Sequence, residues 1–231
     1  MNSFSISVVL PAYNEEENIK NTLLNCINFL NKGFEDYEVI AVNDGSSDRT
    51  KEEIKKMMLE NSRIKLIDHA VNQGYGAALN SGFESAVKDY IFLMDSDGQF
   101  DISDMDLMIP LVTGQNVVLG YRTSRADNMV RSLNAYLYSL YIRLFFGLEV
   151  KDIDCAFKLF PKSAFDSVKP IKSRGALYSA ELLIKFVRNG FEIKEVSVKH
   201  YPRTYGEQSG ANLNVILKMF KESWDIHKDL R

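Results

Sequence analysis

Cysteine and tryptophan are scarce in this chain of 231 residues, which has two cysteines and one tryptophan. Cys26 and Cys155 lie far apart in the sequence, and neither has a second cysteine or a histidine at the spacing of a metal site. The sequence therefore predicts neither a disulfide framework nor a structural zinc site. Two isolated cysteines are typical of a protein of the reducing cytoplasm.

An excess of one charge sign is also missing, and so are long apolar runs. The 28 Lys and Arg residues are balanced by 31 Asp and Glu residues, which gives a net charge of -3, whereas a general nucleic-acid binder carries a basic excess. No uncharged run reaches the roughly 20 apolar residues of a membrane span, and no basic residue precedes Lys20 as in a signal peptide. We therefore expect a globular chain with no nucleic-acid partner, membrane span or signal peptide.

The chain is rich, by contrast, in alternating strand and helix patterns. Short β-branched and aromatic runs predict strands, and apolar positions at helical spacing predict the helices between them. The first half has predicted strands at 5–10, 38–42, 64–67 and 90–94, with helices at 16–31, 48–60 and 76–87. This alternation predicts an α/β fold with a mostly parallel, doubly wound sheet and helices on both faces.

The second half is less regular. It has predicted strands at 117–119, 155–160 and 191–199, and predicted helices at 127–146, 177–189 and 212–230. No internal repeat, low-complexity tract or linker composition separates it from the first half. We therefore expect one domain over residues 1–231.

Polar, turn-forming segments follow each of the first four predicted strands. They are PAYNE, NDGSSD, NQGYG and DSDGQ, at residues 11–15, 43–48, 72–76 and 95–99. In open α/β sheets, ligands bind beyond the carboxyl ends of the strands. Each segment alone is explained as a turn or a helix cap, but four polar segments at one edge predict a binding site.

Asp95 and Asp97 carry the sharpest chemical signal. Two carboxylates that are separated by a single residue raise each other's pKa unless a cation neutralises them. Carboxylate oxygens are hard ligands that select Mg²⁺ or Mn²⁺, which proteins often hold together with substrate phosphates. The alternative is a solvated acidic turn. An EF-hand is excluded, because Gly98 is the fourth residue of this loop and that motif needs glycine at the sixth.

Glycine-rich and basic segments add less specific signals. Residues 74–79 lack the third glycine of a dinucleotide-binding fingerprint and do not follow the first strand, so they do not predict NAD binding. Arg122, Arg131 and Arg203 lie in the second half, and arginine is suited to bidentate phosphate contacts. The alternative for each arginine is an exposed surface charge.

Taken in order, the strings SVVLPAYNEEENI, VIAVNDGSSDRT, NQGYGAALNSGF and YIFLMDSDGQFD resemble the family 2 glycosyltransferases. The later strings GYR, KDIDCAFKLF and HYPRTYGEQSG resemble its dolichyl- or polyprenyl-phosphate mannosyltransferase-like branch. The resemblance implies a GT-A fold, with a nucleotide-sugar-binding half at about 1–100 and an acceptor-binding half at about 101–231. It also implies a metal-dependent, inverting transfer of a hexose from a nucleotide-diphosphate sugar.

The resemblance further implies a set of site residues, which we group by role. The expected donor-binding residues are Pro11, Ala12, Tyr13, Glu15, Asn43, Asp44, Asp95, Ser96, Asp97, Arg122, Arg131 and Lys158. The expected ligands of Mg²⁺ or Mn²⁺ are Asp95, Asp97 and Gln99. The expected catalytic residues are Asp97, Asp152 and Arg203.

The sequence leaves the acceptor and two other functions open. A lipid-phosphate acceptor is already anionic, whereas a saccharide hydroxyl needs a general base, for which Asp152, Asp154 and Glu181 are candidates. A non-catalytic nucleotide-sugar-binding module would keep the fold without the reaction. A haloacid dehalogenase-type phosphatase would use Asp95 as its nucleophile, although its motif has Thr or Val at the position of Gln99 and follows the first strand.

Residues 132–148 are apolar or aromatic around most of a predicted helix, whereas an ordinary surface helix has one apolar stripe. One explanation is a helix buried in the acceptor half or in a homodimer interface. The other is a helix that lies in the bilayer interface, with its flanking arginines at lipid phosphates. The resemblance favours the second explanation. We therefore expect a cytoplasmic protein that contacts the inner face of the membrane peripherally.

Overall fold

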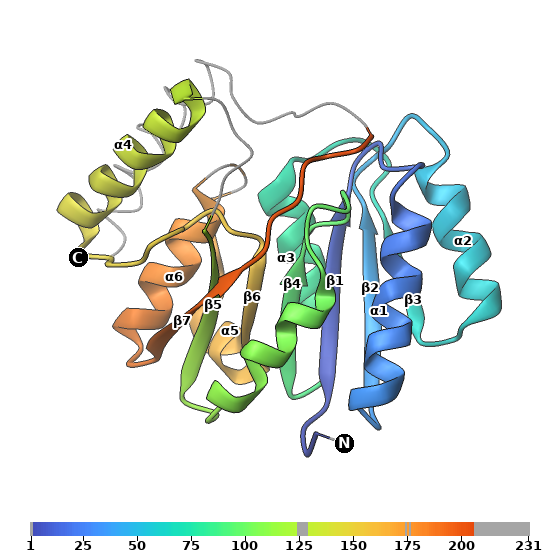
Figure 1. Ribbon diagram of the computed structural model, residues 1–231, viewed down its shortest axis with the longest axis horizontal. Coiled ribbons are helices and arrows are strands. Elements are labelled where there is room, and N and C mark those ends of the chain that lie inside the picture. The colour runs from blue at the N-terminus through green and yellow to red at the C-terminus, as the bar shows by residue number, and fades with distance from the viewer. Residues whose placement is uncertain (1, 124–128, 174, 176, 206–231) are drawn as a thin grey trace.

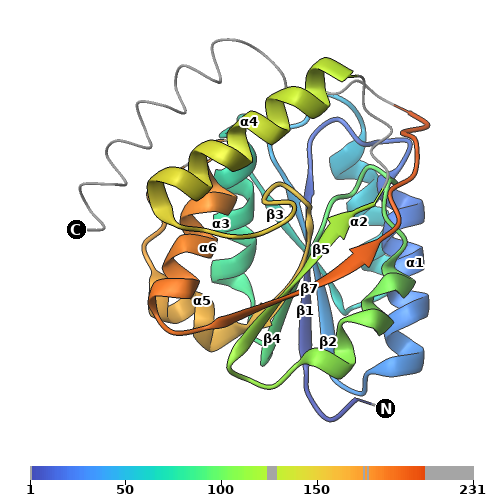
Figure 2. The same ribbon diagram turned by 60° about the vertical axis from the view of Figure 1, so that its left-hand side comes forward.

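One β-sheet runs through both halves of the chain (Figures 1 and 2). The computed structural model describes residues 2–123, 129–173, 175 and 177–205. The strands of this part are β1 (Ile6–Ala12), β2 (Tyr37–Asn43), β3 (Ile64–Asp68), β4 (Tyr90–Met94), β5 (Asn116–Arg122), β6 (Phe157–Pro161) and β7 (Glu192–Val198). Their order across the sheet is β3-β2-β1-β4-β6-β5-β7.

The strand directions agree with the predicted sheet. β1 pairs in parallel with β2 and β4, and β2 pairs in parallel with β3, so the first half forms the expected parallel unit. β6 is antiparallel to both β4 and β5, and β7 is parallel to β5. The prediction of a mostly parallel sheet is therefore confirmed. Through β6, the second half continues the sheet that the first half begins.

Helices cover both faces of this sheet. They are α1 (Ile19–Gly33), α2 (Thr50–Glu60), α3 (Tyr75–Ser85), α4 (Met129–Phe146), α5 (Lys162–Val168) and α6 (Tyr178–Arg188), with the 3-10 helices η1 (Ile102–Leu107) and η2 (Ile109–Leu111). One apolar cluster joins the sheet to α1, α2 and η1, and a second joins it to α3, α4, α5 and α6. Side chains alternate between the faces of a strand. In β1, accordingly, Val9 belongs to the α3 side, whereas Val8 and Leu10 belong to the α1 side.

The elements predicted within the described residues are present, with small shifts at their ends, but three short helices are not predicted. α5 has 7 residues, η1 has 6 and η2 has 3, which is too short to show a repeating apolar pattern. η1 begins at a local cap instead, since the Asp101 side chain accepts a hydrogen bond from the Ser103 N–H at 2.9 Å. The helix predicted at 212–230 lies outside the described residues.

Candidate functional site

The loops at the carboxyl edge of the sheet come together at the top of Figure 1. β1, β2, β4, β5 and β7 end at this edge, and β6, which runs the opposite way, begins there. The chain that leaves β7 crosses the tip of β4, where the Tyr201 N–H donates to the Gln99 carbonyl at 2.8 Å. Residues from both halves of the chain therefore meet at one edge.

Asp95 and Asp97 lie directly beyond β4 and are partly buried. The Tyr75 hydroxyl donates to Oδ1 of Asp95 at 3.0 Å, and the Gln99 N–H donates to Oδ1 of Asp97 at 3.1 Å. Burial, together with the charge of Asp97, raises the pKa of Asp95 to about 7. The surrounding protein groups thus leave part of the negative charge uncompensated, and a divalent cation with oxygen ligands fits such a pair.

A cation held by this pair would need further ligands. Among the described residues, no group of three His, Cys, Asp or Glu side chains is arranged to hold a metal ion. Mg²⁺ is commonly held by one or two carboxylates, with water and substrate phosphates as its other ligands. Gln99, the third predicted ligand, is buried, and its amide nitrogen donates to the Tyr201 carbonyl at 2.9 Å. Its side chain fastens the segment after β7 to the tip of β4.

Arg203 reaches the tip of β4 from that segment. Its guanidinium forms an ion pair with the Glu15 carboxylate, and its Nη1 lies 3.5 Å from Oδ2 of Asp97. Burial raises the pKa of Glu15, although Asn18 and Arg203 favour its charged form. The structure therefore brings together an expected donor residue (Glu15), an expected metal ligand (Asp97) and an expected catalytic residue (Arg203).

Asp44 follows β2 and is buried under the loop after β3. Its Oδ1 lies 2.7 Å from Nδ1 of His69 and accepts from the Gln73 N–H at 2.9 Å, while Oδ2 accepts from the Gly74 N–H at 2.9 Å. The loop packs closely on this turn: a Cβ added at Gly45, whose φ is 67°, would lie 2.3 Å from the loop backbone. Asp44 therefore anchors the loop that leads into α3.

The other expected donor residues of the first half differ in exposure. Pro11 and Ala12 are buried within β1, whereas Tyr13 is 43% exposed at its tip. Asn43 is buried, and its amide donates to the last residue of β3 at 2.8 Å. Ser96 is buried too, and its hydroxyl donates to the Pro11 carbonyl at 2.7 Å. Tyr13 thus presents its side chain at the edge, while Asn43 and Ser96 tie neighbouring strand ends together.

Arg122 and Asp152 form a bidentate ion pair, with Nε 2.7 Å from Oδ2 and Nη2 2.9 Å from Oδ1. Although burial opposes it, the Asp152 carboxylate raises the pKa of Arg122 above its ordinary value. Lys158 is buried in β6, where its ammonium donates to the Cys155 carbonyl and burial lowers its pKa. The charges of Arg122 and Lys158 both act on Asp95, so this group adjoins the carboxylate pair.

Three further candidate site residues, Glu181, Asp154 and Arg131, are not part of the contacts described above. Glu181 is buried at the start of α6, where its carboxylate accepts from the Lys172 and Ser173 N–H groups at 3.0 and 2.8 Å. Although burial opposes it, these donors and a neighbouring lysine lower the pKa of Glu181, so its carboxylate is a poor proton acceptor. Asp154 is exposed. The Arg131 side chain lies outside the part of the chain whose side chains the structure describes.

Two residues of the edge are not among the expected site residues, namely His69 and Tyr75, although Tyr75 lies in the predicted polar segment 72–76. Both lie in the loop after β3 or at the start of α3, and they contact Asp44 and Asp95 respectively. Their position after a strand is the signal that could have identified them. Histidine and tyrosine are intermediate in burial among the residue types, so residue type alone does not separate a site residue from a core residue.

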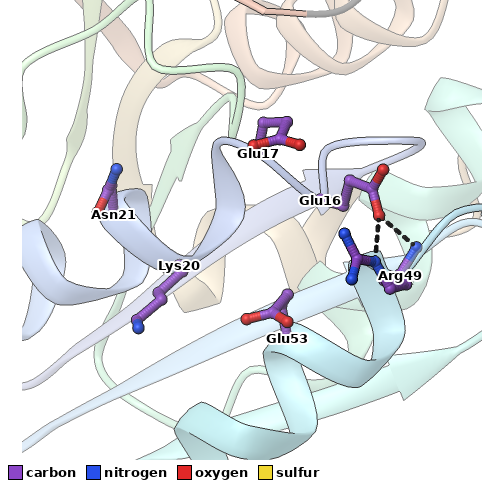
Figure 3. Close-up of a pocket in the computed structure, with 6 residues that line it drawn as sticks. All are labelled: Glu16, Glu17, Lys20, Asn21, Arg49 and Glu53. Atoms are coloured by element: carbon purple, nitrogen blue, oxygen red, sulfur yellow. Dashed lines mark hydrogen bonds and ion pairs between the residues drawn. The ribbon is translucent and has the colours of Figure 1, made fainter.

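A separate hollow of about 250 Å³ lies between the first turns of α1 and α2 (Figure 3). It is lined by Glu16, Glu17, Lys20, Asn21, Arg49 and Glu53. Figure 3 shows the ion pair between Glu16 and Arg49, which measures 3.0 Å. None of the residues expected in the donor site lines this hollow, so we do not assign it to the site at the strand ends.

α4 lies at the outside of the second half (Figures 1 and 2). Of its described side chains, Tyr138 and Ile142 are buried in the core. Leu137, Leu144 and Phe145 are 52%, 73% and 54% exposed. The inner side of the helix is therefore buried, as one sequence-based explanation holds, and several apolar side chains are exposed on its outer side together with Arg143. None of the helices in the described part has the length and apolarity of a membrane span.

Comparison with known proteins identifies the family. The model of the family described as glycosyl transferase family 2 matches residues 7–169. A dolichyl-phosphate beta-glucosyltransferase of Saccharomyces cerevisiae is 26% identical over 96% of this chain and 72% of its own length. One from Trichomonas vaginalis is 29% identical over 98% of this chain and 73% of its own. An undecaprenyl-phosphate 4-deoxy-4-formamido-L-arabinose transferase of Pseudomonas fluorescens is 26% identical over 93% of this chain and 62% of its own length.

Solved structures show the same fold. Glucosyl-3-phosphoglycerate synthase from Mycobacterium tuberculosis, in complex with Mn²⁺ and UDP-glucose, matches with a TM-score of 0.67 and 23% identity, over 96% of this chain and 77% of that one. This likeness confirms the expected GT-A fold. The family match decides between the three functions that the sequence leaves open. The chain belongs to glycosyl transferase family 2 and is a glycosyltransferase, as its motifs predict.

Proposed function

We propose that this enzyme transfers a hexose from a nucleotide-diphosphate sugar to a polyprenyl phosphate, with Mg²⁺ or Mn²⁺ and with inversion at the anomeric carbon. The observation that carries the proposal is the meeting of Asp95, Asp97, Glu15 and Arg203 at the ends of β1, β4 and β7. Relatives named as dolichyl-phosphate and undecaprenyl-phosphate transferases support the acceptor. A structural neighbour bound to Mn²⁺ and UDP-glucose supports the donor and the metal.

The first half, at about 1–100, holds the donor in this proposal. Tyr13 is exposed at the tip of β1 and can pack against the base. Pro11, Ala12, Asn43 and Ser96 shape the same edge from buried positions. Asp44 keeps the loop after β3 in place, and Glu15, which is paired with Arg203, would contact the ribose.

Asp95 and Asp97 would hold the metal ion on the donor diphosphate. A divalent ion bound there neutralises charge that develops on the departing diphosphate. Gln99 contributes by holding the segment of Arg203 on the tip of β4. Arg203, 3.5 Å from Asp97, then lies where it can stabilise the same charge through its planar guanidinium.

The reaction needs few proton transfers if the acceptor is a phosphate. A phosphate oxygen of the acceptor forms a bond to the anomeric carbon, while the bond from that carbon to the diphosphate oxygen breaks and the diphosphate leaves with the electron pair. Attack from the opposite side inverts the configuration. An anionic acceptor needs positioning rather than a general base. With a saccharide hydroxyl instead, the exposed Asp154 is better placed to accept the proton than the buried Glu181.

The second half, at about 101–231, would position the acceptor phosphate. The Asp152 carboxylate accepts hydrogen bonds from two guanidinium nitrogens of Arg122, so Asp152 acts by orienting Arg122. Lys158 adds a buried positive charge beside them. Arg131 would contribute from α4, whose exposed apolar side would rest on a lipid surface. In this proposal the enzyme works at the cytoplasmic face of a membrane, which it contacts through α4.

A two-stage assay tests the proposal. Calorimetry with UDP-, GDP- and dTDP-sugars, with Mn²⁺ and with EDTA, identifies the donor and the metal dependence. Transfer from that donor to a polyprenyl phosphate and to free saccharides is then followed, and the anomer of the product is determined by NMR. We expect metal-dependent transfer to the lipid phosphate with inverted configuration. Transfer to saccharides alone would refute the acceptor, and equal turnover in EDTA would refute the metal.

A further inference from the structure

Tyr75 connects the carboxylate pair to the hydrogen bonds that hold the loop after β3 in place. It is the first residue of α3, and its hydroxyl donates to Oδ1 of Asp95 at 3.0 Å. The residue is 41% exposed, so its ring lies at the surface of the edge while its hydroxyl reaches the carboxylate. This contact joins the loop after β3 to the tip of β4.

The turn that carries Tyr75 is held by Asp44. The N–H groups of Gln73 and Gly74 each donate to an Asp44 oxygen at 2.9 Å. Gly74 has a φ of 94°, a left-handed conformation that glycine adopts without strain, and it directly precedes α3. Because the N–H groups of the two residues before Tyr75 are held by Asp44, the backbone position of Tyr75 is held as well.

His69 extends this support. Its Nδ1 lies 2.7 Å from Oδ1 of Asp44, and its Nε2 lies 2.9 Å from Oγ of Ser81. A carboxylate oxygen accepts, so Nδ1 of His69 donates to Asp44, and a second hydrogen bond joins Nε2 to the Ser81 hydroxyl. Ser81 belongs to α3. We call the side chains of Asp44, His69 and Ser81 the anchor chain. They tie the end of β2 to the loop after β3 and to α3.

The anchor chain has the connectivity of a hydrolase triad, but its surroundings give it no nucleophilic role. Ser81 lies inside α3, where backbone N–H groups bond within the helix, so the donors of an oxyanion hole are not at its hydroxyl. The side chains of His69 and Asp44 are only 8% and 5% exposed. Burial of this kind suits a support better than a reacting group.

We propose that Tyr75 is a positioning residue of the donor site, which orients Asp95 through its hydroxyl, and that the anchor chain holds the turn that carries Tyr75. The inference rests on the proposed function, because it gives Asp95 a role at the metal ion of the donor. A hydroxyl that donates to one carboxylate oxygen restricts the rotation of the carboxylate, and the other oxygen would then be available to a metal ion. Partners of this kind typically change metal affinity by about 10- to 100-fold.

The test compares Tyr75→Phe, which keeps the ring and removes the hydroxyl, with Tyr90→Phe as a matched control at the opposite end of β4. Mn²⁺ is titrated into each protein with saturating UDP or GDP, and free Mn²⁺ is measured by electron paramagnetic resonance. We expect Tyr75→Phe to weaken Mn²⁺ binding about tenfold, with unchanged melting temperature. Tyr90→Phe should bind Mn²⁺ like the wild type.

A second pair of variants tests the anchor chain. His69→Phe should weaken Mn²⁺ binding in the same direction, and it should add little in the presence of Tyr75→Phe, because both act through one contact. Ser81→Ala provides a milder version of the same change. Additive effects would refute the link between the anchor chain and Tyr75. Wild-type Mn²⁺ affinity in Tyr75→Phe would refute the positioning role while leaving the proposed function intact. A wild type that binds no Mn²⁺ with either nucleotide would overturn both.

Discussion

Arg203 and Glu15 are 188 residues apart in the sequence, and their side chains form an ion pair at the tip of β1. The Glu15 side chain is 8% exposed and that of Arg203 is 14% exposed, so each supplies a charged partner for the other in a largely buried position. The pair therefore joins the segment after β1 to the segment after β7. The carboxylate pair beyond β4 lies directly next to this contact, since Arg203 also approaches Asp97 at 3.5 Å.

Replacing Arg203 tests whether this contact serves the reaction. We expect Arg203→Ala to lower kcat by about 100-fold or more, because it removes a charge that stabilises the departing diphosphate. It should also lower the free energy of unfolding by about 1–3 kcal/mol, because Glu15 is left buried without its partner. Arg203→Lys should recover part of the stability and less of the rate, since lysine lacks the planar fork. Steady-state kinetics and urea denaturation give both quantities. Wild-type kcat in Arg203→Ala would exclude a role in catalysis.

Asp97→Asn tests the metal site with little change in shape. We expect kcat/KM to fall by at least about 100-fold and the stimulation of donor binding by Mn²⁺ to disappear. Donor binding in EDTA should stay close to that of the wild type. Asp106→Asn, a change of an exposed aspartate on η1, is the matched control. Metal-dependent turnover at the normal rate in Asp97→Asn would remove this residue from the site.

The fold was predictable where burial leaves a clear mark on the sequence. Every residue of β4 except its first is buried, and a parallel strand covered on both faces appears as a continuous apolar run. The polar tips after these strands mark the edge of the sheet. α5 escapes prediction because its 7 residues follow β6 without a break, so no periodic pattern develops.

The residues of the site were easier to predict than their partners. Asp95 and Asp97 stand out by their spacing, and Arg203 by its place after a strand. The pairing of Arg122 with Asp152, however, depends on β5 and β6 being neighbours in the sheet, which no local pattern encodes. The same holds for Tyr75 and Asp95, which meet only because the start of α3 and the tip of β4 share one edge. Contacts between distant segments follow from the completed fold.

Glu38 provides a prediction about stability and pH. Its buried carboxylate accepts from the Ser7 hydroxyl at 2.6 Å and from the Val87 N–H at 2.9 Å, and it lies 2.5 Å from the Lys65 ammonium. Although burial opposes it, these partners lower the pKa of Glu38 below its ordinary 4.5. The stabilisation is therefore complete above pH 4.5 and is lost as the pH falls through the lower, folded-state value.

We expect Glu38→Gln to lower the free energy of unfolding at neutral pH by about 2 kcal/mol. The difference from the wild type should shrink below about pH 4.5, because the wild-type carboxyl is then increasingly protonated in the unfolded state and later in the folded state. Urea denaturation over a series of pH values measures both curves. A constant difference across the series would show that the ionisation of Glu38 does not stabilise the fold.

The exposed side of α4 makes a prediction about membranes. Leu137, Leu140 and Leu144 follow each other at helical spacing, and all are exposed together with Phe145. Apolar side chains in such a stripe favour the boundary between headgroups and acyl chains. We expect the wild type to co-sediment with vesicles that contain anionic lipid.

Each exposed side chain moved from water into the bilayer contributes about 1.5–3 kcal/mol. The double change Leu144→Ser with Phe145→Ser should therefore reduce vesicle binding by at least about tenfold and leave nucleotide affinity unchanged. Leu59→Ser, at a residue of α2 that is 90% exposed, is the matched control and should not alter vesicle binding. If the wild type ignores vesicles and the double change instead dissociates a dimer, measured by analytical ultracentrifugation, the stripe is an interface between two copies of the chain.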